Sequence, residues 1–364
     1  AALRVRPQLD RYVSGAAMEC NGDERLCGRR LDEITLAGAH NAMGSAEDVR
    51  WMFPNQDESI PGLLRLGIRA FMLDVWYGNA VDETVKTAFE HIFRRLELTA
   101  AVIEGDSFHR YDRAAMGRAV QEAEEKGTHI SHFGPEANLL KELEELFQHY
   151  GRTGEGQRRF YIHDVEEGHK FGQEPGTFTP WEDVPKDTDL LFYEGLHGAM
   201  VNQEVDIANH ADLKIGVVPV VNLEWIQKIH RDTSHRGYCD RDVTHTILRR
   251  MPDYVEHITP QFSRTDINFQ RVPTVDTSNP FVARDIPTPD ESFAVIRFSD
   301  PKKFDIDFPY LLSMLYGSFM SRRNTIVVPG GKMGLAIEVI VMPILEEMMT
   351  RRDRLRAKRS QTAA

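Results

Sequence analysis

Residues 101–113 read AVIEGDSFHRYDR, and they decide how the rest of the chain is interpreted. The apolar beginning of this stretch is typical of a strand, and acidic, histidine and arginine side chains follow at once. Ligands of open α/β sheets bind at the carboxyl ends of strands. Asp106 is suited to take a proton from a sugar hydroxyl, while His109, Arg110 and Arg113 are suited to hold a phosphate. The stretch therefore predicts phosphoryl transfer to a phosphorylated sugar.

The sequence on both sides of this stretch alternates between apolar runs and helical patterns, which indicates an α/β sheet. We expect strands at 34–38, 68–76, 99–103, 159–163, 190–193, 215–222, 293–298 and 324–328. We expect helices at 84–96, 113–126, 136–150 and 334–354. Two stretches rich in proline, glycine and aspartate are expected to be loops, 168–189 and 272–290.

The composition is that of a globular protein, with 41% hydrophobic and 27% charged residues in a chain of 364. The net charge of -12 argues against nucleic acid or an anionic membrane as a partner. No apolar run is long enough for a membrane-spanning helix, and the first residues lack a signal-peptide core. We therefore expect a cytoplasmic protein, with a processed or trimmed start. Cys20 and Cys27 are close enough to pair, which would leave Cys239 over; three reduced thiols are the alternative.

From about residue 84 to 349 the chain resembles bacterial phosphoribulokinase. The segments that carry the resemblance include AAVIEGDSFHRYDRAAM, DLLFYEGLHG, IGVVPVVNLEWIQKIHRD and NTIVVPGGKMGLA, in the family's order. The resemblance implies a P-loop-kinase-like mixed sheet flanked by helices. It also implies transfer of the ATP γ-phosphoryl group to O1 of ribulose 5-phosphate, with Mg²⁺, by a homo-oligomer that serves the Calvin cycle.

The same resemblance implies roles for individual residues. Asp106 matches the catalytic base, and Arg231 and Asp232 match an Arg–Asp pair near the transferring phosphoryl group. Glu194 ends an apolar run, where P-loop NTPases carry their second acid, and Glu194 and Asp232 are expected to hold Mg²⁺. Basic side chains match the sugar-phosphate positions: Arg95, His109, Arg113, Lys228 and Arg236. Taken alone, each of these residues has a plainer interpretation as a surface charge or helix cap.

The family's phosphate-binding loop is not recognisable where it belongs. In the family a Gly-rich loop of the type GSSGAGTT precedes the helix matched from Thr84, whereas residues 76–83 read WYGNAVDE. Backbone N–H groups of such a loop cradle phosphates, and residues other than glycine resist the turns it needs. Asp82 and Glu83 would also repel a triphosphate. We expect the apolar stretch 69–75 to replace the first strand, and we predict that the chain binds ATP poorly.

Residues from about 19 to 78 resemble a different family, the secreted phospholipase C X-domain-like phosphodiesterases. The segments are CNGDERLCGRR, ITLAGAHNAMGSAEDVRWMFPNQDESI and LLRLGIRAFMLDVW. This resemblance implies a catalytic histidine at His40, metal or charge-orienting groups at Asn41 and Asp74, and a secreted segment with a Cys20–Cys27 disulfide. The segment with the family's second catalytic histidine is absent, and His163 in FYIHD is its nearest imitation. Because two strands also cannot close a barrel, we expect His40 to have no catalytic function.

The sequence predicts two domains and leaves three hypotheses for the function. The expected domains are 1–78, a fragment of a phosphodiesterase barrel, and 79–364, the kinase-like domain. The leading hypothesis is a phosphoribulokinase impaired by loss of the Gly-rich loop. The alternatives are a phosphatidylinositol-type phosphodiesterase and a sugar-phosphate-binding protein without catalysis.

Overall fold

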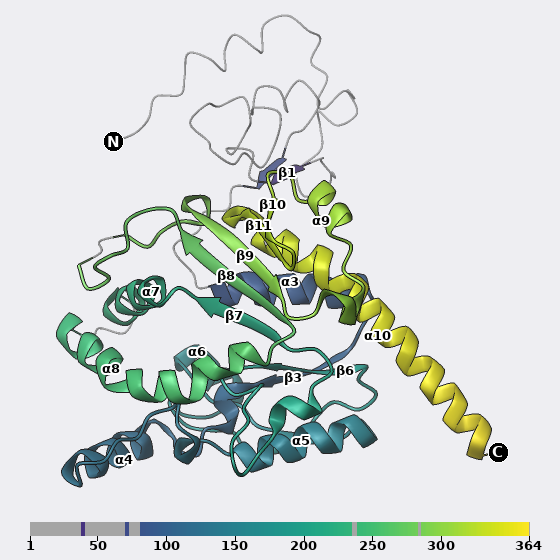
Figure 1. Ribbon diagram of the computed structural model, residues 1–364. Helices are drawn as coiled ribbons and strands as arrows, with labels where there is room; N and C mark the ends of the chain where they lie inside the picture. Colours follow the sequence, from purple (N-terminus) through teal and green to yellow (C-terminus); the bar gives the residue numbers. More distant parts are fainter. Residues whose placement is uncertain (1–37, 41–69, 73–80, 235–238, 283–284, 364) are drawn as a thin grey trace, which may run out of the picture. The chain divides into compact units, whose positions relative to one another are not determined.

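The structure is a computed structural model that describes residues 38–40, 70–72, 81–234, 239–282 and 285–363 (Figure 1). The chain divides into two units, Ala1–Tyr77 and Gly78–Ala364. In the smaller unit, β1 (Gly38–His40) pairs in parallel with β2 (Ala70–Met72). β2 lies in the stretch expected to replace the first kinase strand, but its partner among the described residues is β1.

The larger unit contains a mixed sheet of five strands in the order β10-β11-β9-β8-β7. Only the β7–β8 pair is parallel. Residues of β8 and β9 alternate between buried and more exposed positions, as expected for a sheet covered more fully on one face. The bounds are β7 (Ile215–Pro219), β8 (Ile267–Pro273), β9 (Ser292–Phe298), β10 (Phe319–Arg322) and β11 (Thr325–Pro329).

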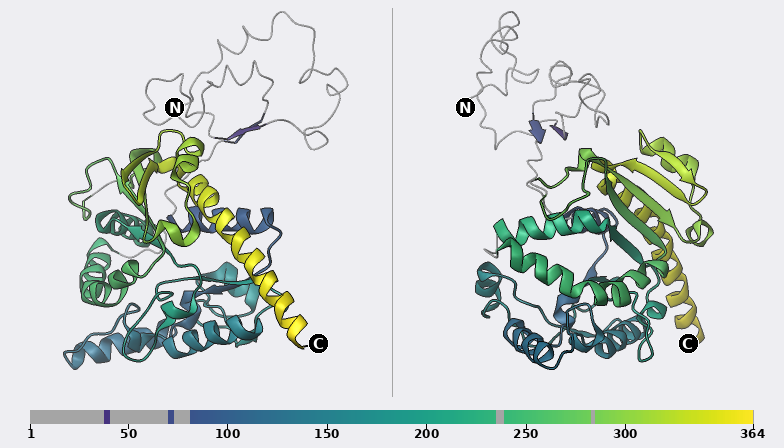
Figure 2. Two further views of the ribbon diagram at one scale, coloured as in Figure 1. Left: turned by 45° about the vertical axis from the view of Figure 1, so that its right-hand side comes forward. Right: turned by 60° about the vertical axis from the view of Figure 1, so that its left-hand side comes forward.

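Two helices cover one face of this sheet, α3 (Val81–Arg95) and α10 (Met333–Ala363). Figure 2 shows α10 running along the sheet. Phe89 and Ile92 of α3 pack with Ile340 of α10 and with the buried side chains of β8, β9 and β11 in one core. Within the described part of the chain, no helix is both long and apolar enough to cross a bilayer.

A second, smaller sheet carries the acidic and basic stretch 101–113. β3 (Ala100–Glu104) pairs in parallel with β6 (Leu190–Glu194), with Glu104 opposite Glu194 at the carboxyl ends. Ala101 and Ile103 of β3 are fully buried against α5 (Leu140–Thr153). The apolar stripe of α5 is therefore what holds the strand that leads to Asp106.

Shorter elements connect these layers. The remaining helices are α4 (Arg113–Glu125), α6 (Val165–Phe171), α7 (Val221–Ser234), α8 (Asp240–Asp253) and α9 (Phe308–Met314). The short strands are β4 (Gln157–Arg158) and β5 (Glu182–Asp183). The single turns are η4 (Gly105–Phe108), η5 (Pro135–Ala137), η6 (Ile207–His210), η7 (Tyr254–Ile258), η8 (Thr259–Ser263), η9 (Pro289–Glu291), η10 (Pro301–Phe304) and η11 (Gly330–Lys332).

Within the described residues no strand joins the two sheets. Instead, β6 and β7 both line a large cavity of about 2560 Å³. Apolar side chains from both strands face it, among them Phe192 and Val217, and α3 contributes Phe89. Among the described residues, no continuous ladder of hydrogen bonds therefore joins the two sheets. They are connected through helices, and strands of both sheets line the same cavity.

The expected fold class, a mixed sheet flanked by helices, is confirmed. The expected strand at 159–163 is wrong, because Tyr161 forms only an isolated bridge with Phe178. The strand expected at 215–222 is too long, since β7 ends at Pro219 and α7 begins at Val221. β8 is absent from the expected strands, because polar residues such as Gln270 interrupt its apolar run.

Candidate active site

The turn that follows β3 brings a carboxylate between two imidazole rings. Asp106 lies in η4, and its side chain is 45% exposed, so a substrate can reach it. Nε2 of His109 lies 3.2 Å from one carboxylate oxygen, and Nε2 of His163 lies 3.8 Å from the other. His163 comes from a loop far along the chain, so only folding places it here.

The orientation of the buried His109 ring is set by Asn138. The Asn138 side-chain nitrogen donates to the carbonyl oxygens of His132 and Gly134, at 2.9 and 2.7 Å, which turns its oxygen towards His109. That oxygen lies 2.7 Å from Nδ1 of His109. Both ring nitrogens of His109 therefore face oxygen acceptors, so the ring is oriented from both sides and one nitrogen is directed at Asp106.

The two acids at this strand end have pKa values that move in opposite directions. Burial would raise the pKa of Asp106, but the hydrogen bond from His109 and the charges of His109, His163 and His132 outweigh burial and lower it. Burial dominates at Glu104 and raises its pKa, although His163 acts against the shift. Neighbouring acids with diverging pKa values are common where proton transfer occurs. At neutral pH Asp106 is the ionised, accepting carboxylate.

His132 covers the other side of His109. The two rings lie 4.5 Å apart between their centres. Burial, and then the charge of His109, lower the pKa of His132 to about 3, so this ring is neutral at neutral pH. The neutral ring of His132 thus covers His109 without adding a charge to the site.

The ends of β3 and β6 approach each other through glycines. A β-carbon on Gly105 would lie 2.7 Å from Cα of Gly195 and 2.8 Å from the Tyr193 hydroxyl oxygen. Only residues without side chains permit this approach. The contact brings the turn with Asp106 close to Glu194, the last residue of β6.

One face of α7 contributes a cluster of charges. Nζ of Lys228 lies 2.5 Å from one oxygen of Asp232, and Nε of Arg231 lies 3.1 Å from the other. Asp232 is buried; burial would raise its pKa, but the Lys228 hydrogen bond and the two cations lower it. Burial lowers the pKa of Lys228, although Asp232 acts against that shift.

Most of the predicted site residues line one cavity, the large one beside β6 and β7. These residues are Asp106, His109, Arg113, Glu194, Lys228, Arg231 and Asp232. Arg113 also donates through Nη2 to the carbonyl oxygen of His163, at 3.0 Å. The interpretation of these residues as one site is thus compatible with their positions, which come from three separate segments.

Of the remaining predicted residues, one lies away from this cavity and the others lie outside the described part of the larger unit. Arg95 is exposed in the last turn of α3 and does not line it. Arg236, Asn41 and Asp74 lie outside the described residues, and His40 falls in β1 of the smaller unit. Among the described residues, no group of three or more acidic, histidine or cysteine side chains is placed to hold a metal ion.

Several residues at the site have no signal in the sequence that assigns them to it. Asn138 and His132 orient and cover His109, and the sequence relates His163 only to a phosphodiesterase histidine. Each lies more than twenty positions from Asp106 along the chain. Spacing along the sequence carries no information about such contacts.

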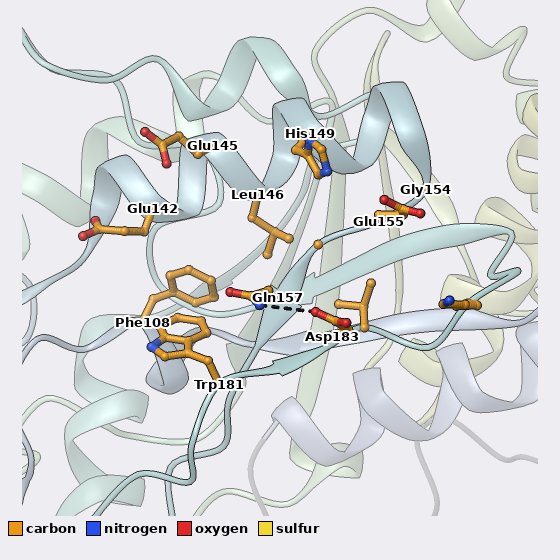
Figure 3. Close-up of a pocket in the computed structure, with 13 residues that line it drawn as sticks. Phe108, Glu142, Glu145, Leu146, His149, Gly154, Glu155, Gln157, Trp181 and Asp183 are labelled. Atoms are coloured by element: carbon orange, nitrogen blue, oxygen red, sulfur yellow. Dashed lines mark hydrogen bonds between the residues drawn. The ribbon is translucent and has the colours of Figure 1, made fainter.

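A smaller cavity of about 500 Å³ is lined in part by Phe108, the last residue of the turn that carries Asp106 (Figure 3). Phe108 and Trp181 form one wall, with their rings edge to face and 5.5 Å apart. Carboxylates, including those of Glu142, Glu145 and Asp183, line much of the rest. None of the predicted site residues lines this cavity.

Comparison with known proteins identifies close relatives. Residues 80–278 match the family described as phosphoribulokinase / uridine kinase. The chromosomal phosphoribulokinase of Cupriavidus necator is 62% identical over 277 residues, which are 76% of this chain and 94% of the relative. A probable phosphoribulokinase of Escherichia coli is 56% identical over 271 residues, which are 74% of this chain and 93% of the relative.

A solved structure agrees with these matches. The phosphoribulokinase from Rhodobacter spheroides covers 75% of this chain and 95% of its own, with a TM-score of 0.69 and 56% identity. The family match begins at residue 80 and lends no support to the phosphodiesterase resemblance of residues 19–78.

Proposed function

Because the chain belongs to the phosphoribulokinase / uridine kinase family, we propose that it transfers the γ-phosphoryl group of ATP to O1 of ribulose 5-phosphate. The O1–phosphorus bond forms as the bond from the γ-phosphorus to its bridging oxygen breaks. The O1 proton passes to a carboxylate, and the products are ribulose 1,5-bisphosphate and ADP. The single observation that carries the site assignment is the ionised Asp106, held between His109 and His163 at the end of β3.

The proposed roles follow from charge and reach. Asp106 accepts the hydroxyl proton as the new bond forms. Arg113 and Lys228 hold the sugar phosphate, and His109 faces Asp106 and orients its carboxylate. Arg231 stabilises negative charge on the transferring group, as phosphoryl transfer depends mainly on positioning and charge. Arg95 and Arg236 are proposed as sugar-phosphate contacts from the family resemblance alone.

We also propose that ATP reacts as its magnesium complex. Mg²⁺ usually binds through one or two carboxylates and takes its other ligands from water and substrate phosphates. Glu194, at the carboxyl end of β6 and on the cavity wall, fits this requirement. Asp232 fits it less well, because each of its oxygens already faces Lys228 or Arg231. When bound, the ion would neutralise charge on the triphosphate.

A coupled assay tests this function. ADP release is followed with ribulose 5-phosphate, ATP and Mg²⁺, and the bisphosphate product is identified by ³¹P NMR. Asp106→Asn is expected to lower kcat by about a hundredfold or more, because the variant cannot accept the proton. Asp183→Asn, an exposed carboxylate on β5, is the matched control and should leave turnover unchanged. Full activity in D106N would show that Asp106 is not the group that accepts the hydroxyl proton.

A second candidate function is binding of the sugar phosphate without turnover. The observation that favours it is the run 76–83, which has one glycine where the family carries several. Calorimetry with ribulose 5-phosphate distinguishes the two. Binding by a wild-type chain that releases no ADP would favour the second function over the first.

We further propose that the protein is a homo-oligomer. β10 is an edge strand, and apolar side chains on it and on the preceding segment are exposed, including Tyr316 and Phe319. An exposed edge presents unpaired N–H and C=O groups with which another chain can pair. Light scattering after size exclusion should give a mass that is a multiple of 41.6 kDa.

A further inference from the structure

One arginine outside the predicted site holds the backbone of the catalytic turn. Nε of Arg159 donates to the carbonyl oxygen of Ser107 at 2.8 Å, and its Nη2 donates to that of His109 at 2.7 Å. One carbonyl belongs to the turn and the other to its C-cap residue, positions where a short helix leaves such groups without partners within the helix. A guanidinium group can bridge both at once, because its N–H groups form a rigid, planar fork.

The guanidinium group is itself held in place by aromatic rings. Its central carbon lies 3.8 Å from the centre of the Phe178 ring and 4.8 Å from that of Trp181. Figure 3 shows Trp181 packed against Phe108, the last residue of the turn. Arg159 is thus positioned on one side by the rings and on the other by the backbone between the two proposed site residues. An ammonium group presents its donors from a single atom, so it does not reproduce the two separate donor positions of the fork.

The remaining contacts of the turn do not duplicate this fork. The Phe108 carbonyl accepts from the backbone N–H of Leu139, and the Asp106 carbonyl accepts from that of His109. Backbone bonds thus tie the Phe108 carbonyl to the segment of Leu139, whereas the side chain of Arg159 bonds the carbonyls on either side of it. Loss of the fork would remove the hydrogen bonds that hold the Ser107 and His109 carbonyls together on one group.

We propose that Arg159 is a positioning residue for the phosphoryl transfer, which rests on the proposed function, and that its fork keeps the Asp106 carboxylate against His109. Arg159 acts through the backbone of the turn and not on the substrate. Misplacement of a reacting group by about 1 Å can reduce turnover a hundredfold. Arg159 therefore affects kcat more than KM, because Arg113 and Lys228 hold the sugar phosphate independently.

The test compares Arg159→Lys with its neighbour Arg158→Lys. Arg158 also pairs with a carboxylate, Glu182 at 3.0 Å, and reaches the Val102 carbonyl, but it does not bond the turn. R159K is expected to lower kcat about tenfold or more and to change KM for ribulose 5-phosphate by less than about threefold. R158K should leave both constants near the wild-type values.

A second readout does not depend on turnover. The Asp106 carboxylate is followed by ¹³C NMR in protein labelled at aspartate Cγ, with its signal assigned by loss in D106N. In wild type it should titrate below its usual range, and in R159K its pKa should rise as the His109 contact loosens. The groups that act on this carboxylate are Glu104, His109, His132, His163, Tyr193 and His197. None of these groups is altered in R159K, so a change in the Asp106 pKa reports a change in the geometry of the turn.

Trp181→Leu keeps the proposal testable if R159K does not fold. Trp181 is 40% exposed, and its loss removes one of the two rings that hold the guanidinium group. W181L is expected to lower kcat by less than R159K does. It is also expected to raise the pKa of Asp106, as R159K does. Unchanged kcat and an unmoved Asp106 titration in folded R159K or W181L would overturn the proposal. If wild type shows no turnover, the kinase function fails, while the titration still decides the role of Arg159.

Discussion

Gly105 and Gly195 face each other across the ends of β3 and β6, and a β-carbon on Gly195 would lie 2.6 Å from Cα of Gly105. This approach is closer than any side chain allows, so the two strand ends meet only because both residues are glycine. The same contact holds the turn with Asp106 beside Glu194. The geometry of the proposed site thus depends on two residues that have no side chain.

Gly195→Ala should therefore force the strand ends apart. We expect the free energy of unfolding to fall by about 1–3 kcal/mol, as for other overpacked sites, and kcat to fall with it. Urea unfolding and the coupled assay measure both. Gly117→Ala is the control, since its new methyl group would meet no atom of another element within 4 Å and should stabilise α4 by about 0.5–1 kcal/mol. Equal effects of G195A and G117A would contradict the steric argument.

Removing the Asp232 charge should destabilise the protein. Asp232→Asn leaves Lys228, whose side chain is only 23% exposed, without its closest counter-charge. Breaking a pair of this kind costs about 3 kcal/mol. The measurement is the urea midpoint of D232N against that of Glu122→Gln. Glu122 forms an exposed pair with Lys126 at the same spacing and should contribute about 0–1 kcal/mol. A loss in D232N no larger than that in E122Q would show that the pair is not structural.

Stability should fall as the pH drops below about 6.5, because two histidines resist protonation in the folded state. Burial lowers the pKa of His197 to about 4, and the pKa of His132 is about 3. Between these values and the ordinary histidine pKa the unfolded chain binds more protons, so the free energy of unfolding decreases as pH decreases. Each histidine contributes up to about 1.4 kcal/mol per pH unit.

Urea titrations between about pH 7 and pH 5 measure this dependence. His197→Gln keeps a donor for the Phe133 carbonyl and should flatten the dependence. The exposed His245→Gln is the control and should leave the slope as in wild type. The lowered pKa values of Asp106 and Asp232 act below about pH 4, where their stabilising effect is lost, so they do not enter this window. A slope that H197Q leaves unchanged would argue against a neutral His197.

Binding of Mg-ATP should be weak. Residues 76–83 offer one glycine and two carboxylates where a triphosphate needs a cradle of backbone N–H groups. Isothermal titration should show affinity well weaker than micromolar, and the KM for ATP should be correspondingly high. Restoring GSSGAGTT in this run should strengthen binding. Micromolar affinity for Mg-ATP in the unaltered chain would contradict the prediction.

The sequence by itself determined the α/β class, the family and the residue types of the proposed site. β3 and β6 are short apolar runs that end in acids, and such runs can be recognised locally because side-chain periodicity belongs to each strand alone. The motif around Asp106 was recognisable for the same reason. β8 and the start of α7 could not be recognised locally, because packing against the sheet, not propensity, decides polar stretches of this kind.

Only the tertiary structure decided how the site is assembled. Asn138 turns His109 towards Asp106, His163 reaches the same carboxylate, and Arg159, from the same loop as His163, donates to carbonyls of the turn. The roles of the two glycines at the strand ends become visible only when folding brings them against each other. These contacts join residues distant in sequence, and the pKa of a buried acid depends on every charge that folding brings near it. No pattern within one segment contains that information.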